Sequence, residues 1–251
     1  MTVKDTGTPA ARGRPRKPWW QRPWIVPLAL VTVVFLGLSV PPYTTLDPAL
    51  ARIEPRADLP WHYPVLVVHI FAGTLAMVAV CLQVWPWLRR NHPGIHRWSG
   101  RVYVMIGVPF VGIASLFIAP LSRAGFSVAV ANTLWGILWL SFTLIGYRMV
   151  RRRRYAEHRE WMLRSFAMIF AIITNRVWSI ICVIAVMPQL ETTYGGDENM
   201  LMLAAAPAAS FLSWTVNLLF VEWWIQYRRH GGRKPGTQAV RPPLSSRPGP
   251  P

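Results

Sequence analysis

Charged residues are scarce in this chain of 251 residues: they make up 15% of it, and only 10 residues are acidic. An ordinary soluble domain carries about a quarter of its residues as Asp, Glu, Lys and Arg. Cysteine is rarer still, because the two residues present, Cys81 and Cys182, both fall inside apolar runs. These shortages exclude an ordinary soluble enzyme, a disulfide framework and a CxxC metal site.

Long apolar runs replace the missing charge, and 53% of the residues are hydrophobic. A bilayer core about 30 Å thick needs about 20 apolar residues in a helix. Six runs satisfy this condition, and they predict helices at residues 23–40, 63–88, 101–121, 126–150, 160–187 and 200–227. The expected fold class is therefore all-α, a six-helix transmembrane bundle. The first run ends at Pro41-Pro42 without an A-x-A-like cleavage site, which favours an uncleaved anchor over a secretory signal.

The two ends of the chain have a different composition. Residues 1–22 and 229–251 are rich in Pro, Gly, Arg and Ser, and such segments cannot bury a core. We therefore expect a disordered basic N-terminal arm, a six-span membrane domain at residues 23–228, and a disordered Pro-rich tail.

Basic residues are distributed unevenly around the spans, and the net charge is +17. Almost all Lys and Arg lie in the N-terminal arm, the second-to-third connection, the fourth-to-fifth connection and the tail. Acidic residues gather in the other connections: Asp47, Glu54, Asp58, Glu191, Asp197 and Glu198. Since the side that retains Lys and Arg is cytoplasmic, both termini are predicted to be cytoplasmic.

The placement of the basic runs also identifies their expected partner. Runs such as Arg151–Arg154 flank spans, so they predict contact with anionic lipid headgroups on the cytoplasmic face and no nucleic-acid partner. The abundance of Arg, Ala, Pro and Gly is typical of a GC-rich bacterial genome. The expected location is the bacterial cytoplasmic membrane.

Polar residues inside the spans form a first candidate layer toward the outer side. Because ionisable groups in a bilayer are costly, His69 and Arg176 are functional-site candidates, and Asn132 is expected at a similar depth. Gly73 and Gln83 share the helical face of His69 and support it; Gly73, with Ala76, predicts close packing against a neighbouring helix. Arg176 has no carboxylate in the outer half of any span, so neutral oxygens, water or an anionic ligand must satisfy it, unless it snorkels to the outer headgroups.

A second candidate layer lies near the cytoplasmic ends. His96 opens the third span with Arg97, Arg101 and Tyr103, and His158 opens the fifth span with Arg159 and Arg164. These similar starts predict that His96, Arg101 and His158 lie close together. Glu160 and Arg164 are spaced for a supporting i,i+4 pair. His92 and His96 have the HxxxH spacing of a zinc helix, but Pro93-Gly94 would break that helix, so no metal site is expected.

Apart from Asn132, the residues of both layers, in this order, resemble those of the bacterial and fungal membrane proteins grouped as the domain-of-unknown-function 2306 family. The matching elements are His69-x-x-x-Gly73 with Gln83, His96-Arg97-x-x-Gly100-Arg101-x-Tyr103, and His158-Arg159-x-Trp161-Met162-x-Arg164-Ser165 followed by Arg176. The resemblance covers about residues 63–180. It implies a multi-pass membrane protein and supplies no reaction.

Several functions stay open. The first is binding or translocation of a small polar or anionic molecule by His69, Asn132 and Arg176. The second is a redox protein with one b-type haem on the cytoplasmic side, because paired histidines such as His96 and His158 are usual axial ligands. The third is a membrane enzyme, although the chain has no HExxH motif, Ser-His-Asp set or paired intramembrane carboxylates. The fourth is a structural or accessory role.

The predicted orientation can be tested with alkaline phosphatase fusions, because that enzyme is active only outside the cytoplasm. Fusions after Pro55 or Tyr194 should be active, and fusions after Pro93 or Tyr155 should be inactive. The reverse pattern of activity would overturn the orientation.

Overall fold

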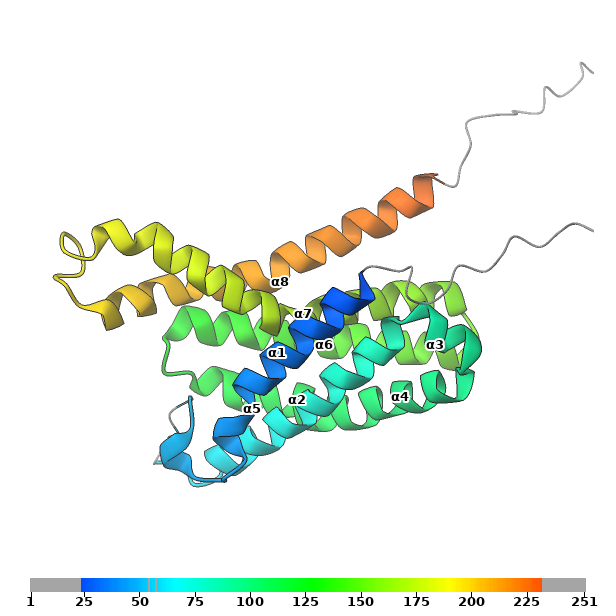
Figure 1. The fold of residues 1–251 in the computed structure, drawn as a ribbon, viewed down its shortest axis with the longest axis horizontal. Coiled ribbons are helices and arrows are strands. Elements are labelled where there is room, and N and C mark those ends of the chain that lie inside the picture. Colours follow the sequence, from blue (N-terminus) through cyan, green and yellow to red (C-terminus); the bar gives the residue numbers. More distant parts are fainter. Residues whose placement is uncertain (1–23, 54, 57, 232–251) are drawn as a thin grey trace, which may run out of the picture. The chain divides into compact units, whose positions relative to one another are not determined.

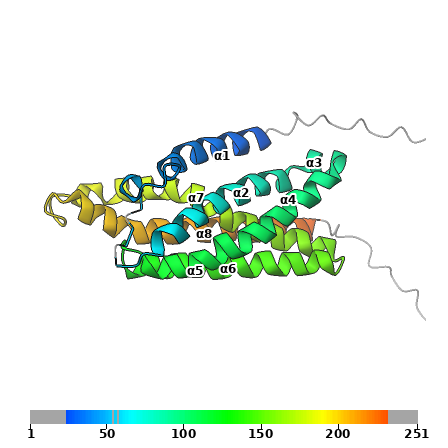
Figure 2. The same ribbon diagram turned by 90° about the horizontal axis from the view of Figure 1, so that it is seen from below.

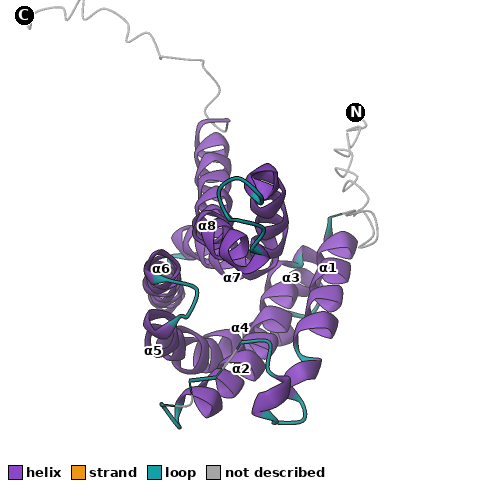
Figure 3. Ribbon diagram, turned by 90° about the vertical axis from the view of Figure 1, so that its left-hand side faces the viewer, coloured by secondary structure: helices purple, strands orange, loops and turns teal. Residues whose placement is uncertain are grey.

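The computed structural model describes residues 24–53, 55–56 and 58–231, which form helices joined by loops, with no strand among them (Figure 3). The α-helices are α1 (Ile25–Ser39), α2 (His62–Val84), α3 (Pro86–Asn91), α4 (Pro93–Ile106), α5 (Ala114–Ile118), α6 (Phe126–Arg151), α7 (Tyr155–Val186) and α8 (Glu198–Gly231) (Figure 1). A π-helical turn, η4 (Gly107–Ile113), joins α4 to α5. Within these ranges, six helical stretches are long and apolar enough to cross a membrane. The prediction of an all-α, six-span protein is confirmed.

Several helices begin or end away from the approximate ends of the predicted spans, because apolar runs report the hydrocarbon segment and not the whole helix. The second helix ends at Val84 instead of residue 88, since Trp85 precedes Pro86 and is extended (φ −80°, ψ 105°). The helix breaks again at His92, as the Pro93-Gly94 pair predicts, and α4 starts there with Pro93 in its first turn. The third and fifth helices therefore begin earlier than residues 101 and 160.

The chain divides into two units, and the boundary falls between Leu140 and Ser141, inside α6. The first unit contains the helices from α1 to α5 and the start of α6. The second contains the end of α6 with α7 and α8. The predicted membrane domain covers both units, and α8 continues to Gly231, beyond its predicted end. The predicted disordered segments, residues 1–22 and 229–251, lie outside the described residues except for positions 229–231.

In the first unit, α2 and α4 run beside each other and α3 connects them (Figure 2). Two glycines allow η4 and α5, which follow α4, to lie close to α6. A Cβ atom on Gly136 would lie 2.7 Å from Ser115 Oγ, and one on Gly107 would lie 3.1 Å from the Trp139 ring. The buried Trp139 donates its Nε1–H to Tyr103 Oη at 2.9 Å. Small residues at a membrane helix interface allow the backbones to approach closely. This close approach increases the van der Waals contact between the helices.

The loop between α1 and α2 is held by local polar contacts. Ile53 donates its backbone N–H to the hydroxyl of the buried Tyr43 at 3.2 Å. Arg56 Nη2 lies 2.7 Å from Asp58 Oδ2, and this hydrogen-bonded guanidinium lowers the pKa of the exposed Asp58 carboxyl. Both contacts lie in the segment between α1 and α2, and they involve only its described residues.

In the second unit, α7 and α8 pack side by side along much of their length (Figure 1). Asn217 Nδ2 donates to Ala167 O at 3.1 Å and to Thr174 Oγ1 at 3.1 Å. Thr174 Oγ1 in turn donates to Ser213 O at 3.1 Å. An interhelical hydrogen bond in a membrane contributes about 0.6 kcal/mol on average, so this network contributes to the α7–α8 pairing.

Candidate functional site

His69 lies on α2 and contacts the π-helical turn η4 in the first unit. Its Nδ1 is 3.1 Å from the backbone oxygen of Val111. A carbonyl oxygen can only accept, so Nδ1 carries the hydrogen, and in the neutral imidazole Nε2 holds the lone pair. Nε2 has no hydrogen-bond partner in the part of the chain that the structure describes. The turn that offers the acceptor contains Pro109, and π-helical turns of this kind often occur at functional sites.

The surroundings of His69 are partly open. One helical turn further along α2, a Cβ atom on Gly73 would meet no atom within 4 Å. At Gly73 itself the neighbouring segment therefore does not approach closely, although the sequence predicts that this face packs against another helix. Close packing holds one turn beyond, where the fully buried Ala76 lies against η4 and would be 3.9 Å from a Cβ atom on Gly107. On this face of α2, η4 contacts His69 and lies close to Ala76, and the space beside Gly73 between them is open.

The other two residues of the outer layer have no contact with His69 that can be described. Asn132 lies on α6 in the first unit, is partly buried, and makes no hydrogen bond to His69 in the described structure. Arg176 lies on α7 in the second unit and is exposed. The shared outer site of His69, Asn132 and Arg176 therefore stays a prediction.

In the first unit, Gln83 connects the end of α2 to the start of α4. Its Nε2 donates to Ser99 Oγ at 2.7 Å and also to the backbone oxygen of His96. Gly100 leaves room for this side chain, because a Cβ atom there would lie 3.3 Å from the Gln83 amide. Gln83 therefore supports the turn that carries His96, although the sequence placed it only on the face of His69.

The remaining α4 candidates separate into exposed and buried residues. Arg97 and Arg101 are exposed, and His96 is partly buried. Tyr103 is fully buried, and its ring meets Trp139 edge to face with 5.9 Å between the ring centres. Tyr103 is thus a core residue of the first unit, and its hydroxyl accepts from an indole.

His158 repeats the arrangement of His69 in the second unit. Its Nδ1 is 2.8 Å from the backbone oxygen of Gly146 on α6, so Nδ1 donates, and Nε2 has no described partner; in the neutral imidazole Nε2 holds the lone pair. Gly146 makes this contact possible, because a Cβ atom there would lie 2.7 Å from Met162 Sδ on α7. Neither backbone acceptor was predicted. The only sequence signal for one of them is a glycine among the bulky residues of the fourth span.

His96 and His158 occupy equivalent positions, each the fourth residue of its helix, after Pro93 in α4 and Tyr155 in α7. They belong to different units, so the predicted proximity of His96, Arg101 and His158 stays a prediction. Arg159, next to His158, is exposed. The described residues contain no group of three or more His, Cys, Asp and Glu side chains that could hold a metal ion.

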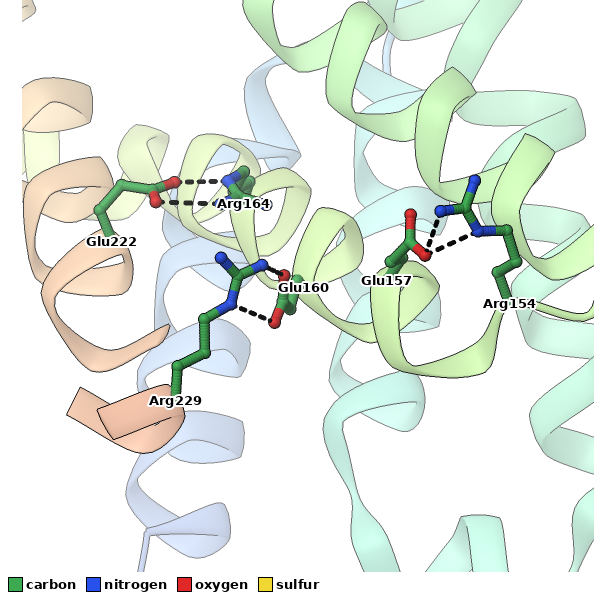
Figure 4. Close-up of polar contacts among 6 residues, drawn as sticks. All are labelled: Arg154, Glu157, Glu160, Arg164, Glu222 and Arg229. Atoms are coloured by element: carbon green, nitrogen blue, oxygen red, sulfur yellow. Dashed lines mark hydrogen bonds and ion pairs between the residues drawn. The ribbon is translucent and has the colours of Figure 1, made fainter. Parts of the chain in front are cut away.

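Arg164 forms an ion pair between helices, and the predicted Glu160–Arg164 pair is wrong. Two of the three guanidinium nitrogens of Arg164, Nε and Nη2, donate to the Glu222 carboxylate on α8, and Nη2 lies 2.9 Å from Oε2 (Figure 4). Glu160 is bound by Arg229 of α8, whose Nε is 3.0 Å from Oε1 (Figure 4). Each carboxylate accepts two parallel N–H···O hydrogen bonds, and such a bidentate pair is stronger than an i,i+4 ion pair on the surface of one helix. The two pairs fix the register of α7 against α8.

The chain matches the family model described as "Predicted membrane protein (DUF2306)" over residues 66–225. The match includes His69, His96, His158, Arg164 and Glu222. No curated protein and no solved structure matches the chain.

The ion pair between Arg164 and Glu222 should contribute measurably to stability, because the Arg164 side chain is only 13% exposed. Arg164→Glu places two carboxylates together and should cost about 2 kcal/mol, seen as a lower melting temperature in detergent. The exchanged double variant, Arg164→Glu with Glu222→Arg, should recover most of the loss. Arg154→Gln is the control, because its pair with Glu157 is exposed and should contribute little. Equal losses in the single and double variants would contradict a pairwise interaction.

Proposed function

We propose that this chain, which belongs to the DUF2306 family of predicted membrane proteins, is a membrane electron-transfer protein in which His158 would bind the iron of one b-type haem. One observation carries the proposal. The Nδ1–H of His158 is bound by the backbone oxygen of Gly146, and the lone pair of Nε2 has no partner among the described residues.

The chemistry of this donor fits a haem. A ligating imidazole needs one unprotonated nitrogen, and it usually donates its other N–H to a carbonyl or carboxylate that fixes the tautomer and the ring orientation. The neutral imidazole of His158 satisfies both conditions. The close contact of Gly146 with Met162 keeps the acceptor in place, so the ring has little freedom to turn.

The other candidate residues have roles that follow from their positions. The sequence alone offers His96 as a second ligand, and in the first unit Gln83 holds the turn of His96 through a hydrogen bond to its backbone oxygen. Arg97 and Arg101 lie one turn apart on α4 and are exposed, so each guanidinium group is accessible to an anionic group. A bound haem iron would take up and release one electron. His158 would hold the iron through Nε2, and the Gly146 backbone oxygen would keep the ring oriented.

The haem proposal predicts a Soret band in protein purified in detergent from cells supplied with haem. His158→Ala should reduce the haem bound per protein at least about tenfold, because Ala supplies no ligand. His92→Ala is the matched control, since His92 is exposed at the break between α3 and α4, and it should keep the band. Folded wild-type protein without a Soret band, or folded His158→Ala with full haem content, would refute the proposal.

A second candidate function, binding of a small polar molecule in the outer layer, is favoured by one observation at His69. The lone pair of Nε2 has no described partner, and the space beside Gly73 is open. A neutral imidazole with this tautomer accepts a hydrogen bond, so His69 selects a ligand with a hydroxyl or amine donor instead of an anion. An anionic ligand would depend on Arg176.

Filling the open space should separate this second function from the first. Gly73→Leu should displace a small molecule that remains bound in native mass spectra of the extracted protein, and it should leave haem content unchanged. Gly37→Leu is the control, because a side chain on that glycine of α1 also meets no atom within 4 Å. A bound molecule that survives Gly73→Leu, or a wild-type spectrum with none, would contradict the second function.

A further inference from the structure

The C-terminal half of α8 has two different faces. One face contacts α7 through Asn217, Glu222 and Arg229. Large side chains on the other face recur every three or four residues and are exposed: Val216, Leu219, Phe220, Trp223, Trp224 and Tyr227. Because α7 already occupies the polar face, the exposed face is available to something outside the described chain.

The aromatic rings on this face touch one another. Trp223 and Tyr227 are stacked with 5.8 Å between ring centres, and Trp224 and Tyr227 are stacked at 6.4 Å. The guanidinium carbon of Arg228 lies 5.1 Å from the centre of the Trp224 ring. We call Trp223, Trp224, Tyr227 and Arg228 the aromatic–basic patch.

Arg228 differs from its neighbour Arg229 in one respect. Arg229 is bound by Glu160, whereas Arg228 has only the Trp224 ring as a partner within the described residues. The indole holds the guanidinium in place without neutralising its charge. A fixed cation without a carboxylate attracts an anion and repels the ammonium group of a choline headgroup.

The depth of the patch points to the headgroup region. Trp223 lies 25 residues after Glu198, the first residue of α8, which corresponds to about 37 Å along the helix. The hydrocarbon core is about 30 Å thick, and the bilayer with its headgroups is about 40–45 Å thick. If Glu198 lies in the headgroups on one side, the patch lies in the headgroups on the other. Trp and Tyr concentrate at this level in membrane proteins.

We propose that the aromatic–basic patch binds the headgroup of an anionic phospholipid. Arg228 pairs with the lipid phosphate, and the Tyr227 hydroxyl and the indole N–H groups are hydrogen-bond donors at the same level. The acyl chains lie along Val216, Leu219 and Phe220, which continue the patch toward the bilayer centre. This site is independent of the proposed haem, because it uses none of its residues.

The neighbouring arginines allow a matched experiment in nanodiscs of mixed phosphatidylglycerol and phosphatidylcholine. Arg228→Gln and Arg229→Gln each remove one positive charge at the same end of α8. Arg228→Gln should lower the preference for phosphatidylglycerol, measured by native mass spectrometry of retained lipid, about fivefold. Arg229→Gln should keep the preference and lower the melting temperature instead, because it breaks the pair with Glu160.

Two further variants complete the test. Trp224→Leu keeps an apolar side chain but removes the ring that holds Arg228, so it should lower the preference about two- to threefold. Arg228→Lys keeps the positive charge, so it should keep most of the preference for phosphatidylglycerol. It replaces Arg228→Gln in the test if that variant does not fold. Equal losses in both Gln variants would show a general charge effect and overturn the proposal. Equal retention of phosphatidylcholine by the wild type, or loss of lipid preference on adding inorganic phosphate alone, would also overturn it.

Discussion

Every polar group that enters the hydrocarbon must find its partner inside the protein, because lipid tails offer none. Thr74 and Thr133 meet this constraint locally, donating to the carbonyl oxygens of Ile70 and Ala129 four residues earlier. Gln83, Asn217 and Arg164 meet it across helices. The interhelical bonds therefore do two things at once: they satisfy the side chain and fix which helices pair. His69 and His158 meet the constraint only in part, since the Nδ1 atoms are bound and the described residues leave both Nε2 atoms without partners.

Glycine decides where these interhelical bonds can form. His158 reaches the backbone of α6 because Gly146 lets Met162 approach, and Gln83 reaches the turn of His96 because Gly100 has no side chain. Gly136 and Gly107 similarly bring α6 against Ser115 and the segment before it. In lipid there is little hydrophobic gain from pairing helices, so close backbone approach supplies much of the contact energy. Each of these glycines leaves room for a close contact between helices. At Gly73, by contrast, no atom occupies the space that a side chain would fill.

The helical architecture could be predicted from the sequence because a bilayer sets the length of each apolar run independently of tertiary contacts. The helix ends could not, since α4 and α7 continue through polar residues from Pro93 and Tyr155 that no apolar run includes. His69 was identifiable as a candidate from the cost of burying an ionisable group, and His158 from the similar starts of the third and fifth spans. Their acceptors were not, because the acceptors are backbone oxygens of Val111 and Gly146, and any residue has one. The partner of Arg164 was missed for a related reason: the sequence spacing favours Glu160, whereas the packing of α8 brings Glu222.

The tautomer shared by the two histidines limits what each can bind. With Nδ1–H held by a carbonyl, Nε2 can accept a hydrogen bond or coordinate a metal, but it cannot donate to an anion. A second proton would reverse this, because an imidazolium donates from both nitrogens and has no lone pair left. Haem coordination at His158 therefore requires a neutral imidazole, whereas anion binding at His69 requires an imidazolium, although both rings make the same Nδ1–H hydrogen bond to a carbonyl. An anion in the outer layer needs the charge of Arg176, which lies on α7 in the second unit, whereas a neutral hydroxyl or amine needs only the lone pair of His69. The first unit by itself thus favours a neutral, hydrogen-donating ligand.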